Sequence, residues 1–277
     1  MINKEEEKET IVAQPPQADD LILSGRKVHF WKGGKGQGIL LIHSAWGDAE
    51  MSWSSVWGGL SAAFTVIAPD LPGFGQSAPM ARPTLSAMAR SLRELIEALN
   101  LDRIIVAGNS FGAAVALQFA RDFPEMTVQL VLVDGGDMPV LPGVLRMLIS
   151  WQPVNRAFRR LMFYFSFSSR ALKKSFANPS QLRPDFFAGI RRNAHIYAAV
   201  VFDTFMNIPG PFPVPKVTIF LIWGAQDGLT PLKQAKGLQK RFPGTLLISI
   251  YGAGHMPQIE RPQEFLTAIV SIGKNAR

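Results

Sequence analysis

Short continuous runs of apolar residues alternate along most of the chain with stretches whose apolar residues recur at helical spacing. The stretch "TLSAMARSLRELIEALNL" predicts a helix with Thr84 as its N-cap, because its apolar positions are three or four residues apart. The continuous runs are too short for such helices and are rich in β-branched residues. They predict strands, which we place in "GILLIHS", "FTVIAPD", "RIIVAG", "QLVLVDGG", "VTIFLIWGAQD" and "TLLISIYGAGH".

Strands that are apolar throughout and alternate with helices are typical of a mainly parallel sheet covered on both faces. The segment "LILSGRKVHFWKGG" adds a predicted hairpin with its turn at Ser24-Gly25. The sequence therefore predicts the α/β class, with a mostly parallel, doubly wound sheet. Most of the predicted strands end in small or polar residues, and functional groups collect at the carboxyl ends of such sheets.

The alternation stops between residues 138 and 213, which are basic, aromatic and compatible with helices. Prolines stand at both ends of this segment, in "PVLP" and in "PGPFPVP". We interpret it as a helical cap inserted between two strands of the sheet. The predicted organisation is a loose tail over residues 1–20, a first core part over 21–137, the cap over 138–213, and a second core part over 214–277.

Composition excludes several classes of chemistry. The 277-residue chain contains no cysteine, so disulfides, iron–sulfur clusters and thiol catalysis are ruled out. The charged start "MINKEEEKET" does not resemble a secretory signal, and the run "VTIFLIW" is far shorter than the ~20 residues of a membrane-spanning helix. We expect a cytoplasmic protein. The glycine-rich "GGKGQG" lacks the ending of a phosphate-binding loop, and no metal-ligand cluster stands out, so no cofactor or metal is expected.

The net charge of +8 is concentrated in the predicted cap. Eleven basic and two acidic residues lie between Met138 and Lys216, so the rest of the chain is close to neutral. No nucleic-acid motif accompanies this charge, and we expect no nucleic-acid partner. Together with Trp151 and ten phenylalanines, the basic residues could rest on anionic lipid. We favour instead the interpretation that the basic residues form a solvated face, which could also attract an acidic substrate. The sequence does not indicate the oligomeric state.

The motif "GNSFG" stands between a predicted strand and a predicted helix, which is the setting of a nucleophile elbow. A sharp turn there would hold Ser110 in a strained conformation, with Gly108 and Gly112 avoiding steric conflict around it. A serine hydroxyl needs a positioned base to act as a nucleophile. Ser110 is therefore the candidate nucleophile.

His255 is the best of four candidate bases, because it lies in a loop after the last predicted strand, in "YGAGHMPQIERP". His29 and His195 are expected to have structural or packing roles, and His43 to shape a loop. The acid that orients the base is expected to be Asp227 in "WGAQDGLTP", given the chain order serine, acid, histidine. Asp134 and Asp137 in "VDGGD" are the alternatives.

An ester-cleaving site also needs two backbone N–H groups that bind the oxyanion. Phe111, directly after the nucleophile, and Ala45 in "HSAWGD" are the expected donors. We further expect Trp46, Ser44 and Met256 to contact the substrate.

With these motifs in place, the chain resembles the α/β-hydrolase family over nearly all of its length beyond the tail. The resemblance rests on "LLIHSAWGD", "PDLPGFGQS", "GNSFG", "WGAQDGLTP" and "GAGHMPQIERP", in the order typical of that family. It implies Ser110, Asp227 and His255 as a catalytic triad and Asp70 as a structural residue. One departure is Ser44, which stands where the family has glycine; a positive φ there would strain the loop.

The resemblance implies a cofactor-free serine esterase that acts on a small, largely apolar acyl or aryl ester. A serine nucleophile argues against haloalkane dehalogenases and epoxide hydrolases of this fold, which use an aspartate. The elbow also resembles that of carbon–carbon hydrolases acting on vinylogous diketones. However, those enzymes usually have a Gly-rich oxyanion loop and a tryptophan after the histidine, where this chain has "HSAWG" and Met256. A lactonase, a thioesterase or a non-enzymatic binding protein are further alternatives.

Overall fold

The computed structural model describes residues 14–138, 140–182, 184–208 and 213–274. One eight-stranded sheet runs through the molecule in the order β1-β2-β4-β3-β5-β6-β7-β8. Strands β3 to β8 are parallel, whereas β1 and β2 form an antiparallel hairpin that also joins β4 antiparallel. The strands are β1 (Gln17–Leu23), β2 (Arg26–Gly33), β3 (Gly38–Ile42), β4 (Thr65–Pro69), β5 (Ile104–Asn109), β6 (Thr127–Val133), β7 (Thr218–Gly224) and β8 (Leu246–Ile250).

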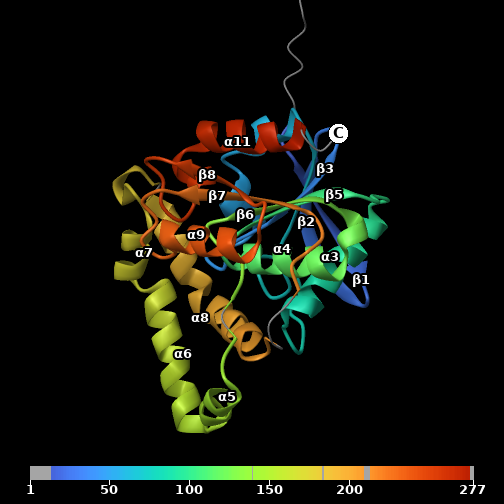
Figure 1. The fold of residues 1–277 in the computed structure, drawn as a ribbon. Helices are drawn as coiled ribbons and strands as arrows, with labels where there is room; N and C mark the ends of the chain where they lie inside the picture. Colours follow the sequence, from blue (N-terminus) through green and yellow to red (C-terminus); the bar gives the residue numbers. More distant parts are fainter. Residues whose placement is uncertain (1–13, 139, 183, 209–212, 275–277) are drawn as a thin grey trace, which may run out of the picture.

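Helices cover both faces of the sheet, because its central strands are apolar on both sides (Figure 1). Leu40 and Ile42 of β3 belong to one apolar core, while their neighbours Ile39 and Leu41 belong to the other. The first core includes α3 (Leu85–Ala98), α4 (Phe111–Asp122) and α9 (Leu232–Arg241). The second includes α1 (Ala49–Trp53), α2 (Trp57–Ser61) and α11 (Pro262–Lys274). The predicted doubly wound α/β sheet is thus confirmed.

The segment between β6 and β7 is helical and extends away from the sheet on one side (Figure 1). It comprises α5 (Gly143–Ser150), α6 (Gln152–Phe167), α7 (Ser169–Ser175) and α8 (Pro184–Met206). Helix α6 packs along α8, where the rings of Phe158 and Phe202 lie 5.9 Å apart. This is where the sequence predicted an inserted cap, and we keep that word for α5 to α8. Phe212, one of the ten cap phenylalanines, lies outside the described residues.

Some local features of the structure match the predictions made from the sequence, and others differ from them. Thr84 caps α3 as predicted, its Oγ1 accepting a hydrogen bond from the Ala87 N–H at 3.0 Å. The predicted tail is wrong at its end, because residues 17–20 pair with β2 as part of β1. Residues 1–13 of that tail lie outside the described residues. Helices α1 and α2 were not predicted, since five residues are too few for a helical period to show.

Across the described ranges, none of the helices combines the length and the apolar character that crossing a bilayer requires.

Helix α4 packs so closely on the sheet that its second residue has no room for a side chain. A Cβ atom at Gly112 would lie 2.3 Å from the carbonyl oxygen of Ile42. We therefore expect Gly112→Ala to lower the free energy of unfolding by about 1–3 kcal/mol, as overpacking does. Urea denaturation followed by circular dichroism measures this change.

Gly237 in α9 is the matched control, because a Cβ atom there would meet no heavy atom within 4 Å. Gly237→Ala should raise the free energy of unfolding by about 0.5–1 kcal/mol, since alanine loses less conformational entropy in a helix. Equal effects of the two substitutions would contradict the close approach of α4 to β3.

Candidate active site

The turn between β5 and α4 holds Ser110 in a backbone conformation that L-residues rarely adopt. Its φ is 56° and its ψ is −115°, and its N–H donates to the carbonyl of Val133 at 2.8 Å. The turn requires glycine at Gly108, where a Cβ atom would lie 2.2 Å from the Gly112 carbonyl oxygen. The predicted strained elbow is therefore present, and it places the Ser110 hydroxyl above the carboxyl ends of the strands.

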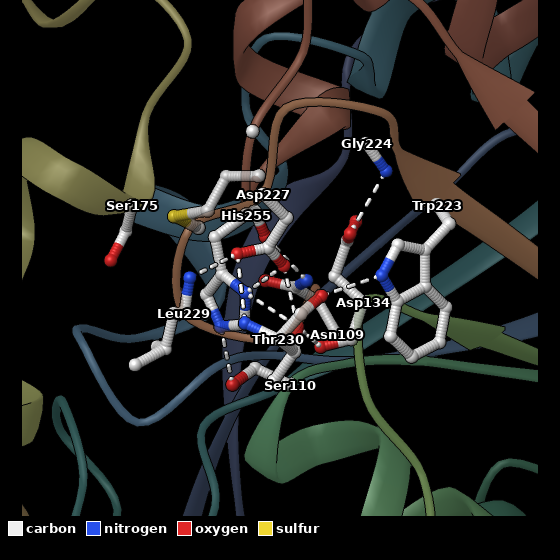
Figure 2. Close-up of polar contacts among 12 residues, drawn as sticks. Asn109, Ser110, Asp134, Ser175, Trp223, Gly224, Asp227, Leu229, Thr230 and His255 are labelled. Atoms are coloured by element: carbon white, nitrogen blue, oxygen red, sulfur yellow. Dashed lines mark hydrogen bonds and ion pairs between the residues drawn. The ribbon is translucent and has the colours of Figure 1, made fainter. Parts of the chain in front are cut away.

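Three side chains that are distant in the sequence meet at this turn in one continuous line of hydrogen bonds (Figure 2). The Ser110 Oγ lies 2.7 Å from His255 Nε2, and His255 Nδ1 lies 2.7 Å from Asp227 Oδ2. A proton on Nδ1 can be donated to the carboxylate, which leaves Nε2 free to accept the serine proton. The structure thus brings together the three residues that the sequence singled out.

The Asp227 carboxylate is held by the loop in which it stands. Its Oδ1 accepts hydrogen bonds from the N–H groups of Leu229 and Thr230 at 2.7 and 2.9 Å, and its Oδ2 lies 2.5 Å from the Thr230 hydroxyl. Burial by itself would raise the pKa of Asp227, but the charge of His255 and these hydrogen bonds lower it below its ordinary value. Asp227 is therefore ionised and faces the imidazole at neutral pH.

Asp134, the alternative acid from the sequence, lies in the same buried cluster but does not bond to the histidine. Its Oδ1 accepts from the Gly224 N–H at 2.9 Å, and its Oδ2 has no hydrogen-bond partner within the described ranges. Burial, and next the adjacent Asp227 carboxylate, raise the pKa of Asp134 well above its ordinary value. Two neighbouring carboxyl groups thus have opposite pKa shifts, so the site favours the charged form of Asp227 and the neutral form of Asp134.

The other alternative acid, Asp137, pairs with arginine side chains. It forms ion pairs with Arg241 and with Arg121, the latter at 3.6 Å. Burial and the positive charge of Arg241 lower the pKa of Arg121 to about 10, so the Arg121 guanidinium remains charged at neutral pH. The three residues form a charged group beside the candidate site.

The remaining histidines have structural contacts. His43 is buried and joins two loops, since its Nδ1 donates to the Ser44 carbonyl and its Nε2 accepts from the Leu71 N–H. His29 Nδ1 lies 2.7 Å from the Asp20 carboxylate, and the His195 ring stacks on Phe163 in the cap. None of these three reaches Ser110 in the part of the chain that the structure describes.

The sequence did not single out the side chains that hold the His255 loop in place. Asn109, next to the serine, donates to the His255 carbonyl at 3.1 Å and accepts from Gln258 at 3.3 Å. The His255 N–H donates to the carbonyl of Ser175 at the end of α7. Only the identity of Asn109 inside the motif could have suggested this role, because its partners are about 150 residues away in the sequence.

A cavity of about 610 Å³ opens next to Ser110 between the sheet and the cap. Ala45 and Phe111, the expected oxyanion donors, line it together with Trp46, Met162, residues 134–138 after β6, and residues of β7 and α9. Asp137 and Arg241 are among the lining residues. The lining is mostly apolar, so the cavity suits an uncharged, largely hydrocarbon group.

The three residues expected to contact substrate differ in their placement. Trp46 lines the cavity, covers the His255 ring edge-on with the ring centres 4.9 Å apart, and donates from Nε1 to the Ser166 carbonyl in α6. Ser44 and Met256 are buried and are not part of the cavity wall. Ser44 does not have a positive φ, so the strain expected there is absent, and its hydroxyl accepts from the Trp46 N–H.

The ligand atoms of Asp134, Asp227 and His255 lie within 4.8 Å of one another, which is close enough to hold a metal ion. However, the imidazole nitrogen that faces the carboxylates already donates its proton to Asp227.

The raised pKa of Asp134 generates a prediction about stability. A native carboxyl group with a raised pKa keeps a proton that the unfolded chain releases above pH 3.8, so the contribution of Asp134 to stability falls as the pH rises from there. Asp134→Asn removes this contribution. We expect the stability of the variant relative to wild type to increase as the pH rises above about 4. Urea unfolding of both proteins at a series of pH values measures the difference, and a difference independent of pH would contradict the assignment.

Comparisons with known proteins agree with the fold. A protein of Mycobacterium tuberculosis without an assigned function is 29% identical over 275 residues, covering 92% of this chain and 80% of its own length. The 2-hydroxy-6-oxo-6-phenylhexa-2,4-dienoate hydrolase of Burkholderia cepacia is 24% identical over 263 residues, or 88% of this chain and 90% of its own. The solved structure of a thermophilic esterase from Thermogutta terrifontis superposes with a TM-score of 0.74 and 22% identity, covering 94% of this chain and 99% of that one.

The family model described as the alpha/beta hydrolase family matches residues 39–268. That range includes β3 to β8, the cap and every residue of the candidate site. The chain therefore belongs to the α/β-hydrolase family.

Proposed function

We propose that the protein is a serine hydrolase that cleaves a carboxylic ester with a largely apolar acyl or aryl group. The observation that carries this proposal is the continuous line of hydrogen bonds from Ser110 through His255 to Asp227. Its serine end lies in the wall of the cavity, so a bound carbonyl group can reach the nucleophile. Family membership supports hydrolysis as the reaction type.

In the proposed mechanism, Ser110 Oγ attacks the ester carbonyl carbon while His255 Nε2 takes the hydroxyl proton. Asp227 accepts the Nδ1 hydrogen bond and stabilises the imidazolium that forms. The carbon–oxygen bond to the leaving alcohol breaks, and His255 returns the proton to that alcohol. A water molecule then gives its proton to His255 and attacks the acyl-enzyme, which releases the acid and restores Ser110.

The tetrahedral intermediate needs donors for its negative oxygen. The N–H of Phe111 is the first of helix α4, where the helix dipole favours an anion. Ala45 lines the same cavity from the loop after β3. We assign these two N–H groups to the oxyanion hole, and we leave Ser44 and Met256 out of the substrate contacts.

Carbon–carbon bond hydrolysis is the second candidate function. The Burkholderia cepacia relative is named for a dienoate substrate, which is a carboxylate. Arg241, in the wall of the cavity, could bind such a group, although Asp137 offsets part of the charge there. Parallel assays separate the two candidates, because a carbon–carbon hydrolase would cleave a vinylogous diketone but barely turn over simple aryl esters.

Removal of the nucleophile tests the proposal. We expect Ser110→Ala to lower kcat for p-nitrophenyl esters at least about a thousandfold, since binding and the oxyanion donors alone supply little of the rate. A fluorophosphonate probe should label the wild type and not the variant. Ser271→Ala, on α11 at the far face of the sheet, serves as the control and should behave like the wild type. Undiminished ester turnover by Ser110→Ala would rule out the assignment.

Exchange of each acid for its amide identifies the one that orients the base. Asp227→Asn should lower kcat by about 10³–10⁴-fold, because an amide favours the wrong imidazole tautomer. Asp134→Asn should keep kcat within about tenfold of wild type, since burial favours the neutral form of Asp134 and its Oδ1 bonds to Gly224 rather than to His255. Steady-state kinetics on one aryl ester compares the two variants, and the reverse ranking would move the role to Asp134.

A further inference from the structure

Four apolar residues at the end of the cap have the spacing of a buried helix face, yet they are exposed. Val144, Met147 and Leu148 of α5 and Trp151, the residue that follows this helix, stand at i, i+3, i+4 and i+7, with 68%, 66%, 52% and 66% of their surface exposed. Such a stripe normally packs against another element. Figure 1 places α5 at the end of the cap that is far from the sheet, where no other element covers it among the described residues.

Helix α6 continues this exposed surface with apolar and aromatic side chains that stand outside its ring contacts with α8. Its inner side packs on α8, where the Arg159 guanidinium lies 4.0 Å from the Phe202 ring centre. Its outer side presents Leu161, Tyr164 and Phe165, which are 49%, 49% and 59% exposed. We call the outer residues of both helices the tip surface: Val144, Met147, Leu148, Trp151, Leu161, Tyr164 and Phe165.

Positive charge borders the tip surface. Arg156 and Arg160 are exposed on the outer side of α6, one and two turns after Trp151. The sequence from Met138 to Pro184 contains no acidic residue. A hollow of about 380 Å³ between α6 and α8 is lined by Arg160 and Tyr164 of α6 and by His195 of α8, among others, and is large enough for a phosphate group.

We propose that the tip surface docks on an anionic lipid bilayer. Exposed aliphatic side chains would enter the headgroup region, tryptophan and tyrosine favour that interface, and arginine pairs with lipid phosphate. The contact is peripheral, since no described helix is long and apolar enough to cross the bilayer. A second copy of the chain fits this surface less well, because pairing would bring Arg156 and Arg160 of both copies together.

Docking would place lipid next to the cavity. The inner side of α6 carries Met162 and Phe167, which line the cavity, and the Ser166 carbonyl, which accepts the hydrogen bond from Trp46. An acyl chain leaving the bilayer would therefore meet the entrance of the proposed ester site. Docking itself does not require catalysis and is tested with Ser110→Ala protein. The docking proposal could therefore be correct even if the proposed ester hydrolysis were not.

Cosedimentation with vesicles tests the proposal. Ser110→Ala protein should bind vesicles in which a third of the lipid is phosphatidylglycerol, bind pure phosphatidylcholine vesicles weakly, and dissociate as sodium chloride is added. Trp151 is the tryptophan at this surface, so its emission should shift to shorter wavelength on binding. The shift should be absent in a Trp151→Phe variant.

Surface variants separate the tip surface from exposed residues elsewhere. Met147→Ser/Trp151→Ser should abolish most of the binding, whereas Tyr251→Ser, at a position 79% exposed, should not change it. Arg156→Glu/Arg160→Glu should lower the partition coefficient by roughly 25-fold or more. Lys233→Glu/Lys236→Glu on α9 changes the net charge equally and should have a much smaller effect. Circular dichroism checks that each variant is folded.

Three outcomes would overturn the proposal. One is equal binding to anionic and neutral vesicles, and another is equal loss of binding in the α6 and α9 charge variants. The third is a dimer in sedimentation velocity that Met147→Ser/Trp151→Ser converts to a monomer, because the tip surface would then bind a second copy of the chain.

Discussion

The strained backbone of Ser110 is the constraint on which the rest of the site depends. A residue with φ of 56° between a strand and a helix persists only where the surrounding packing fixes it. The close contact of Gly108 with Gly112 and the bond from the Ser110 N–H to Val133 supply that packing. The strain is thus balanced by the packing of β5, β6 and α4, whose residues are almost all buried. The hydroxyl is held in place before any substrate binds.

Residues of both the cap and the core hold the base, His255, in position. His255 is fixed from the core by Asn109 and Asp227 and from the cap by the Ser175 carbonyl. Trp46 covers the imidazole and is itself held by a carbonyl of α6. A movement of α6 or α7 would therefore reach the proposed triad through hydrogen bonds. This coupling gives the exposed outer side of α6 a direct physical connection to the cavity on its inner side.

Local patterns were enough to predict most of the architecture. Apolar runs of strand length and the periodic helix after Thr84 identify the layers of the sheet, because each depends only on neighbours in the sequence. The motif around Ser110 was recognisable for the same reason, since its glycines and its strand-to-helix setting are contiguous. The order of strands implied that Asp227 and His255 would lie at the same edge as the serine. The short helices α1 and α2 left no periodic signal and were missed.

The sequence by itself determined the class of the fold and the residues able to perform the chemistry. It left three acids open, and their environments distinguish them. Asp227 receives hydrogen bonds from its own loop and from His255, whereas Asp134 is buried with one oxygen unpaired and Asp137 pairs with arginines. It also could not tell which cap residues face outward, because the spacing of Val144, Met147 and Trp151 is that of a buried face. Burial and charge pairing depend on segments far apart in the chain, so only the tertiary structure decided them.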